Sequence, residues 1–203
     1  MRARALLLTL TLAGTATLTA CTTSSNGDSA GAPAGVPTPA ASATASAHNA
    51  ADAMFASMMI PHHAQAVQMA DLMLAKQDIP AEVTALAKAI KQAQQPEIDQ
   101  MNGFLTSYGQ PTVDPTASPM QMHGMAMDGM LTDDQLQQLR DADGATATRL
   151  FLTQMVGHHT GAIAMAKTEI STGKDPAAIA LAKNIVTDQQ AEISQMRTLL
   201  NQL

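Results

Sequence analysis

Two histidine pairs are the residues of this chain best suited to chemistry. They account for four of its six histidines, and each pair follows a methionine in the pattern Met-hydrophobic-x-His-His. Imidazole nitrogen and thioether sulfur are borderline-to-soft ligands, and without a thiolate they select copper, Cu(I) above all, over magnesium or calcium. The pairs are His62 with His63 and His158 with His159. A metal site that uses these side chains is the first hypothesis the sequence offers.

A glutamate follows each histidine pair further along the chain. Glu97 and Glu192 each lie in a Gln-x-x-Glu-Ile-x-x-Met motif, which ends at Met101 in one copy and Met196 in the other. Helical periodicity predicts that both glutamates lie near the centre of a buried apolar stripe. A buried unpaired carboxylate is costly, so each should be hydrogen-bonded, protonated, paired with a cation or bound to metal. The histidines of facing helices are the predicted partners.

The spacing of these motifs indicates a tandem duplication of a two-helix unit. Residues 59–70 and 155–166 carry the histidine motif, and residues 86–101 and 181–196 carry the glutamate motif at nearly the same offset. Aromatic residues make up only 2% of the chain, so the core must consist mostly of Ala, Leu, Ile, Val and Met. Such a core suits closely packed helices better than sheets, and we predict an all-α fold.

Cap and turn residues predict where the helices begin and end. Pro80 and Pro176 suit the first turn of a helix, Thr132 suits an N-cap, and Gly144 and Gly173 suit helix ends. The long helices are predicted over about 52–76, 80–107, 145–171 and from 176 onward, with a short helix after Thr132.

The first 21 residues have the features of a bacterial lipoprotein signal peptide. Arg2 and Arg4 precede an apolar run that is too short to span a membrane. The sequence Leu-Thr-Ala-Cys at residues 18–21 resembles a lipobox, in which Cys21 carries lipid after cleavage. An unmodified thiol is the alternative. We expect export and anchoring at the outer face of the cytoplasmic membrane.

The remainder divides into a linker and one duplicated domain. Residues 22–50 are almost wholly Thr, Ser, Ala, Gly and Pro, a composition that predicts disorder. Residues 51–203 form the domain, with one repeat at about 52–107 and the other at about 132–203. The formal net charge is -6, and no basic stripe exists to neutralise phosphates, so a nucleic-acid partner is disfavoured.

The loop between the repeats, residues 108–131, offers a second set of metal ligands. Methionines flank a histidine here, whereas exposed apolar side chains in a loop normally gain nothing. A flexible segment of this kind can wrap a Cu(I) ion. The alternative is a hydrophobic cover over the bundle end. The ligand candidates in the loop are Met120, Met122, His123, Met125, Met127 and Met130.

The duplicated His-His and Gln-x-x-Glu-Ile-x-x-Met pattern resembles the secreted bacterial family called domain of unknown function 305, over about residues 52–202. The resemblance implies a ferritin-like four-helix bundle, in which two tandem two-helix repeats pack together. It also implies copper, because one group in that family is associated with copper binding and copper resistance. The ligand candidates are His62, His63, His158, His159, Glu97, Glu192, Met59, Met155, Met101 and Met196.

Two interpretations of the histidines stay open at this stage. They could bind metal, or His-Glu hydrogen bonds could tie the bundle together while Met fills gaps. Adjacent histidines on an ideal helix diverge by about 100°, so both cannot face one point. One of each pair could bind while the other packs or faces solvent.

The function also has two alternatives to copper handling. A membrane-tethered helical module could bind another envelope protein, since the acidic surface and the tether permit it. A ferritin-like metal-dependent oxidase is weaker, because such sites use Glu-x-x-His spacing and no glutamate stands three residues before any histidine. No nucleophile triad, phosphate-binding loop or cysteine pair suggests another reaction, and we predict that the protein is not an enzyme.

Overall fold

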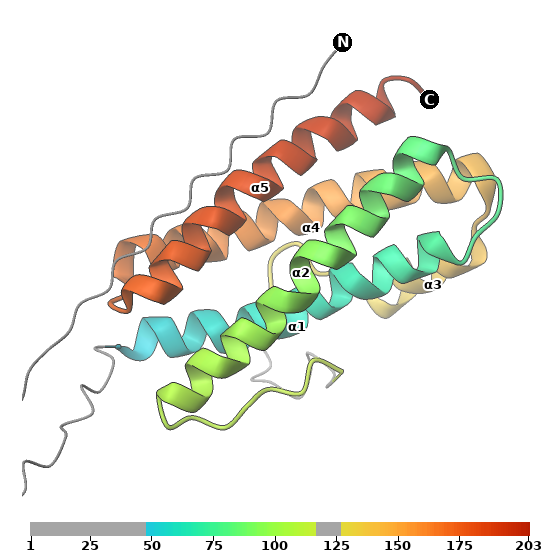
Figure 1. Ribbon diagram of the computed structural model, residues 1–203. Helices are drawn as coiled ribbons and strands as arrows, with labels where there is room; N and C mark the ends of the chain where they lie inside the picture. Colours follow the sequence, from blue (N-terminus) through green and yellow to red (C-terminus); the bar gives the residue numbers. More distant parts are fainter. Residues whose placement is uncertain (1–47, 117–126) are drawn as a thin grey trace, which may run out of the picture. The chain divides into compact units, whose positions relative to one another are not determined.

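The structure is a computed structural model that describes residues 48–116 and 127–203. Its helices are α1 (Ala50–Leu74), α2 (Ala81–Ser107), α3 (Asp133–Asp141), α4 (Gly144–Thr172) and α5 (Pro176–Leu200), and no strand occurs in these two ranges (Figure 1). The predicted signal peptide, most of the linker, Cys21 and the loop candidates Met120, Met122, His123 and Met125 lie outside the described residues. No helix in the described part is long and apolar enough to cross a membrane.

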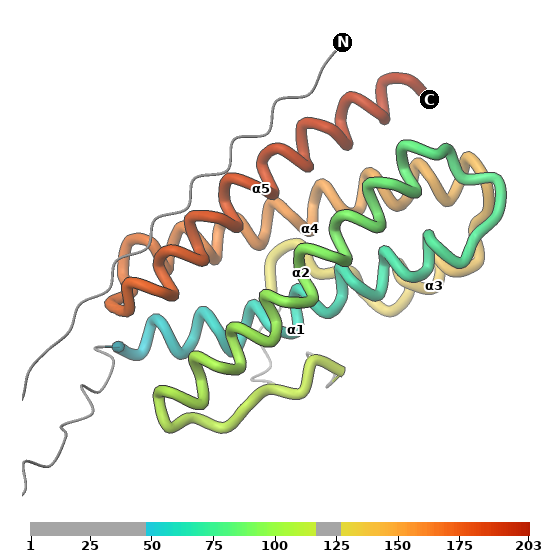
Figure 2. The backbone as a smooth tube through the Cα atoms, in the orientation of Figure 1, coloured from blue at the N-terminus to red at the C-terminus, as the bar shows by residue number. Residues whose placement is uncertain are grey.

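The four long helices form two hairpins that pack on each other. α1 lies along α2, and α4 lies along α5, as the backbone trace shows (Figure 2). The two hairpins meet mainly through α1 and α4, and the short helix α3 packs against these same two helices. The prediction of an all-α four-helix bundle built from two tandem two-helix repeats is therefore confirmed.

The helix ends follow from local hydrogen-bonding side chains. Asn49 caps α1 in a capping box with Asp52, and Thr132 caps α3 in the same way with Gln135. Asp175 caps α5, whose first residue is Pro176. These side chains accept hydrogen bonds from N–H groups that have no partner within the helix. The predicted cap at Thr132 is confirmed.

The buried faces of α2 and α5 are rotated relative to the predicted stripes. Gln94 and Ile98 are buried in α2, whereas Ala93 is exposed and Glu97 lies at the edge of the buried face. The predicted central position of Glu97 is therefore wrong, and that of Glu192 is wrong in the same way. A carboxylate at the edge keeps part of its hydration, and the neutral side chains of Gln94 and Ile98 occupy the centre.

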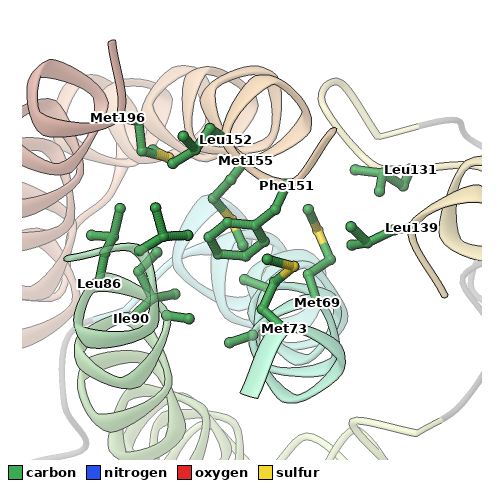
Figure 3. Packing of buried hydrophobic residues seen from close by; sticks show 14 of the residues in the cluster. Met69, Met73, Leu86, Ile90, Leu131, Leu139, Phe151, Leu152, Met155 and Met196 are labelled. Atoms are coloured by element: carbon green, nitrogen blue, oxygen red, sulfur yellow. The ribbon is translucent and has the colours of Figure 1, made fainter. Parts of the chain in front are cut away.

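Buried apolar residues form two clusters, one on each side of a polar layer. The cluster in Figure 3 contains Met69, Leu86, Ile90, Phe151, Met155 and Met196. The other contains Phe55, Met59, Ile98, Met101, Ala162, Leu181 and Ile185. On α1, α2 and α5 the histidines or the glutamine of the repeated motifs lie between the two clusters in sequence, and on α4 the same holds except for Ile163, which belongs to the cluster in Figure 3. The polar layer consists of His62, His63, Gln94, His158, His159 and Gln189, all of them buried.

Candidate metal centre

The first histidines of the two pairs face each other inside the bundle. The ring centroids of His62 and His158 are 3.8 Å apart, and their planes are inclined by 42°. The side chains expose 0% and 1% of their surface. Residues 62 and 158 lie on the faces by which α1 and α4 contact each other, so this contact is also the junction between the two repeats.

The second histidines point to the partner helix of their own repeat. His63 lies 2.8 Å from a carboxylate oxygen of Glu97, and His159 lies 2.6 Å from one of Glu192, in each case through Nε2. Because neighbouring residues on a helix point about 100° apart, a histidine pair on α1 can reach both α4 and α2. None of the four rings faces solvent, and the predicted contacts between histidine and glutamate are confirmed.

These contacts define which ring nitrogen carries a hydrogen. A carboxylate can only accept, so Nε2–H of His63 and of His159 donates to the glutamate. The two glutamate side chains remain 19% exposed, which suits an anion. In the neutral ring this leaves Nδ1 as a lone pair, and the Nδ1 atoms of His63 and His159 are buried without a hydrogen-bond partner in the described residues. Each glutamate therefore accepts a hydrogen bond from the second histidine of its own repeat.

A short backbone segment, residues 127–131, crosses the facing histidines, and we call it the strap. The Nε2–H of His62 donates to the backbone carbonyl of Asp128 at 3.3 Å. The side chain of Gln65 forms two hydrogen bonds with the backbone of Leu131, at 3.0 and 2.7 Å. These bonds fasten the strap to α1.

Glycines allow the strap to lie directly on α4. A Cβ at Gly161 would collide with the carbonyl of Asp128, and a Cβ at Gly129 would lie 2.7 Å from the carbonyl of Gly157. Gly129 also has a φ of +86°, which favours glycine. The second repeat has Gly157 and Gly161 where the first has Pro61 and Gln65, so only α4 can accept the strap backbone this closely.

The facing imidazoles are held in their neutral form. Burial first, and then the electrostatic interaction with His63, lowers the pKa of His62 to about 3, although the Asp128 carbonyl opposes the shift. Burial and the neighbouring imidazoles hold the pKa of His158 well below its usual value. Neutral imidazole is the form that binds metal. The Nδ1 atom of His62 and both ring nitrogens of His158 are buried and form no hydrogen bond of good geometry among the described residues, although the backbone of His62 lies near enough to oppose the lowering of the His158 pKa.

The predicted methionine ligands are divided between the two ends of the bundle. Met59 and Met101 are fully buried in one apolar cluster, and Met155 and Met196 are fully buried in the other. Met127 and Met130 lie on the strap and are partly buried. The structure therefore does not bring all the predicted ligands together.

The histidines and acids alone do not form one preorganised centre. In residues 48–116 and 127–203 no group of three or more His, Cys, Asp or Glu side chains is arranged to hold a metal ion. Instead the predicted residues form three pairs, namely His62 with His158, His63 with Glu97 and His159 with Glu192. A pocket of about 680 Å³ lies beside the strap, lined by Gln65, Met130 and Leu131 among others, but no histidine lines it.

Two groups of polar residues in this region were not predicted from the sequence. Gln94 and Gln189 are buried in the polar layer, and some of their amide atoms have no hydrogen-bond partner in the part of the chain that the structure describes. They occupy the same place in the repeated motif, one turn before the glutamate, and this repetition could have identified them. Gln65 and Asp128 gave no such signal, because their contacts join segments far apart in the chain.

The fold and the repeated motifs define a class of duplicated helical-bundle proteins. The sequence profile of the family described as domain of unknown function, DUF305, matches residues 52–200. The chain therefore belongs to the DUF305 family. Among curated proteins no sequence matches this chain significantly.

Solved structures of the same family resemble this one closely. A DUF305 fragment from Deinococcus radiodurans is 32% identical with a TM-score of 0.67, covering 76% of this chain and 98% of that one. A DUF305 protein from Streptomyces coelicolor, assigned as secreted, is 36% identical with a TM-score of 0.67, covering 75% and 93%.

The structure also resembles the protein CopM, which has been crystallised with metals. CopM in its Cu(II)-bound form is 30% identical with a TM-score of 0.63, and in its Cu(I)-bound form 28% identical with a TM-score of 0.60. Each covers 74% of this chain and 96% of the CopM chain. A silver-bound form of CopM matches to a similar extent.

Proposed function

We propose that this protein is an exported copper-binding protein of the cell envelope, which handles or stores copper, Cu(I) in particular, and is not an enzyme. The observation that carries the proposal is the facing pair His62 and His158. Buried polar atoms are normally hydrogen-bonded, and an unpartnered one has to be explained. Here three buried ring nitrogens of one pair have no partner in the described residues, and the rings are neutral. Each neutral ring has one nitrogen with a lone pair, and a metal ion that accepts one lone pair from each ring would explain why these two nitrogens are buried without a partner.

The neighbouring residues suit that role. Methionines lie one turn before each facing histidine, at Met59 and Met155, and thioether with imidazole is a ligand set that favours Cu(I). Glu97 and Glu192 would orient His63 and His159 through Nε2–H, as second-sphere carboxylates commonly do for metal-binding histidines. In this proposal the glutamates position imidazoles, and the ligand atoms are nitrogen and sulfur.

Similarity to other proteins and the N-terminal sequence support the choice of copper as the metal and the proposed location in the cell envelope. CopM, a structural relative at about 30% identity, has been crystallised with Cu(I), Cu(II) and silver, ions that all accept soft ligands. A second relative is assigned as secreted. The sequence of residues 1–21 adds the proposal of a lipid anchor at Cys21, followed by the linker of residues 22–50.

A Cu(I) competition titration against a chromogenic chelator tests the proposal. His62→Phe and His158→Phe should each weaken binding or remove an equivalent of copper, because each deletes a ligand. His48→Phe is the matched control: it deletes an imidazole outside the centre and keeps a ring against Tyr108, on which His48 stacks with centroids 4.2 Å apart. Unchanged affinity and stoichiometry in both centre variants would rule out the histidine pair as the copper site.

Three companion measurements address the other parts of the proposal. X-ray absorption of protein purified from copper-supplemented cells distinguishes sulfur from nitrogen and oxygen ligands. Replacing all five loop methionines, Met120 to Met130, should lower copper stoichiometry, and no change would remove the loop from the copper-binding role. Pull-down from envelope extracts with and without chelator, and oxygen consumption with added iron, test the interaction module and the oxidase.

A further inference from the structure

A second buried polar cluster lies at the start of α1, apart from the histidines. It consists of three carboxyl groups and one phenol, which come from four different elements. Its members are Asp52 of α1, Glu169 of α4, Asp175 at the N-cap of α5 and Tyr108 at the C-cap of α2, and none is more than 7% exposed. Three ionised carboxylates in one buried cluster would repel one another strongly. The stability of this end of the bundle therefore depends on which of the three carboxyl groups carries a proton.

Two of the three acids are surrounded by donors and suit the ionised form. One oxygen of Asp52 accepts from the N–H of Asn49 at 2.6 Å. The other accepts from the N–H groups of Lys174 and Asp175 at 2.9 and 2.8 Å. Burial would raise the pKa of Asp52, but these hydrogen bonds outweigh it and lower the pKa. Asp175 accepts from the Tyr108 hydroxyl at 2.7 Å and from the first turn of α5.

Glu169 lies in the opposite environment. It is 1% exposed, and neither of its oxygens accepts a hydrogen bond from a donor in the described residues. Its carboxyl group packs on Gly173, where a Cβ would lie 2.6 Å from the carboxyl carbon, and it contacts Asp52. Burial is the largest cause that raises the pKa of Glu169, to about 8, and the adjacent carboxyl group of Asp52 and the charge of Asp175 add to the shift.

Among the described residues, the charged groups that act on Glu169 are the acids Asp52 and Asp175, which supply no counter-charge. The imidazole of His48, which precedes α1, stacks on the ring of Tyr108. α1 presents Asp52, the N-cap of α5 presents Asp175, and the end of α2 presents the Tyr108 hydroxyl, which already donates to Asp175. The nearby cation in sequence, Lys174, contributes a backbone N–H while its side chain is exposed. A neutral Glu169 can donate an O–H to the Asp52 carboxylate, whereas an ionised one can only repel it.

We propose that Glu169 keeps its proton at neutral pH and donates it to Asp52, so that a carboxyl–carboxylate clasp joins the end of α4 to the start of α1. Mild alkali removes the proton and opens the clasp, because two buried carboxylates then lie in contact. Asp52 also holds the α4–α5 turn through Lys174 and Asp175, so opening loosens that turn as well. The clasp involves none of the histidines and does not depend on copper binding.

The direct test is the titration of Glu169 in the metal-free wild-type protein. Its side-chain carboxyl carbon, assigned by NMR through its own backbone correlations, should titrate near pH 8. Hydrogen exchange at the amides of Lys174 and Asp175 should accelerate, beyond the ordinary base-catalysed increase, over the same range. A carboxyl carbon that titrates near 4.5 would overturn the proposal.

A substitution at position 169 distinguishes the effect of ionisation from the effect of side-chain packing. Glu169→Gln keeps a donor toward Asp52 but cannot ionise, so the Tm of this variant should change little from pH 6 to pH 9, whereas that of the wild type falls. Glu82→Gln, which alters an exposed glutamate in the first turn of α2, is the control and should follow the wild type. Parallel pH profiles for wild type and Glu169→Gln would also overturn the proposal. If Glu169→Gln does not fold, the wild-type titration alone decides.

Discussion

Glu192→Ala is the substitution that most directly tests how the acids act on the histidines. In the structure Glu192 accepts a hydrogen bond from Nε2–H of the fully buried His159 at 2.6 Å. Alanine removes the acceptor and leaves a buried donor unsatisfied, which costs roughly 1–3 kcal/mol. For a chain of this size 1 kcal/mol corresponds to about 2–4 °C, so the Tm of the metal-free variant should fall by about 2–12 °C.

The same substitution should weaken copper binding without removing a ligand atom. Loss of a second-sphere partner typically costs about 10–100-fold in metal affinity, because the imidazole is no longer held in one orientation and tautomer. Glu192→Gln keeps an oxygen that can accept from Nε2–H, so it should retain most of the affinity. A Cu(I) competition titration measures the affinity, and differential scanning calorimetry measures the Tm.

The comparison between the two variants can refute this reasoning. If the glutamate were itself a ligand, Gln would lose nearly as much affinity as Ala, because an amide oxygen binds copper poorly. If neither variant changed the affinity, the His159–Glu192 pair would be structural only. Glu82→Ala, at an exposed position far along the sequence from the centre, is the control and should change stability by no more than about 0.5 kcal/mol.

Three further predictions concern the strap, the core and acid stability. Gly161→Ala places a Cβ on the carbonyl of Asp128, so the strap must move, and urea unfolding should show a loss of about 1–3 kcal/mol. Met155→Ala, at a fully buried position, should cost about 2–5 kcal/mol by the same assay, whereas Met54→Ala, 56% exposed, should stay within about 0.5 kcal/mol. The pKa of His62 is lowered to about 3 in the folded protein, so on acidification this histidine takes up a proton in the unfolded chain before it does so in the folded one. His62 should therefore lower the free energy of unfolding of the metal-free protein as the pH drops below 6.5, by up to about 1.4 kcal/mol per pH unit. Because the raised pKa of Glu169 acts in the opposite direction over this range, the urea midpoints of the wild type and of His62→Phe are compared at pH 6.5 and pH 4.5. Equal changes of midpoint in the two proteins would contradict this last prediction.

The elements of the fold follow closely from local sequence rules. The predicted first helix, about 52–76, is observed as Ala50–Leu74, and the predicted cap at Thr132 forms a capping box. The reason is that helix ends depend on neighbouring residues, which supply or withhold hydrogen bonds to the terminal N–H and C=O groups. The duplication is likewise visible in the sequence, because both copies keep the same residue types at the same spacing.

The orientation of each helix about its own axis was not predicted correctly. The helical period predicted for α2 was nearly right, but the prediction placed Glu97 at the buried centre, where the structure has Gln94 and Ile98. Two faces of a helix whose residues are shifted by one position point about 100° apart. The hydrophobicity of the residues of α2 does not by itself show clearly which of two such faces is buried. The packing of α2 on α1 determines which face of α2 is buried, and it leaves Glu97 at an edge from which its side chain reaches His63.

The sequence by itself determined the two-repeat helical plan and most of the helix ends, since these depend on residue types at short spacing, and its repeated motifs predicted the histidine–glutamate pairs. Only the tertiary structure decided that His62 meets His158, that the strap covers them, and that Glu169 contacts Asp52. Those contacts join residues far apart in the chain, and they exist only when the helices have packed in one register. The physical reason is that a helix fixes the direction of a side chain relative to its own axis, whereas its neighbours decide what lies in that direction.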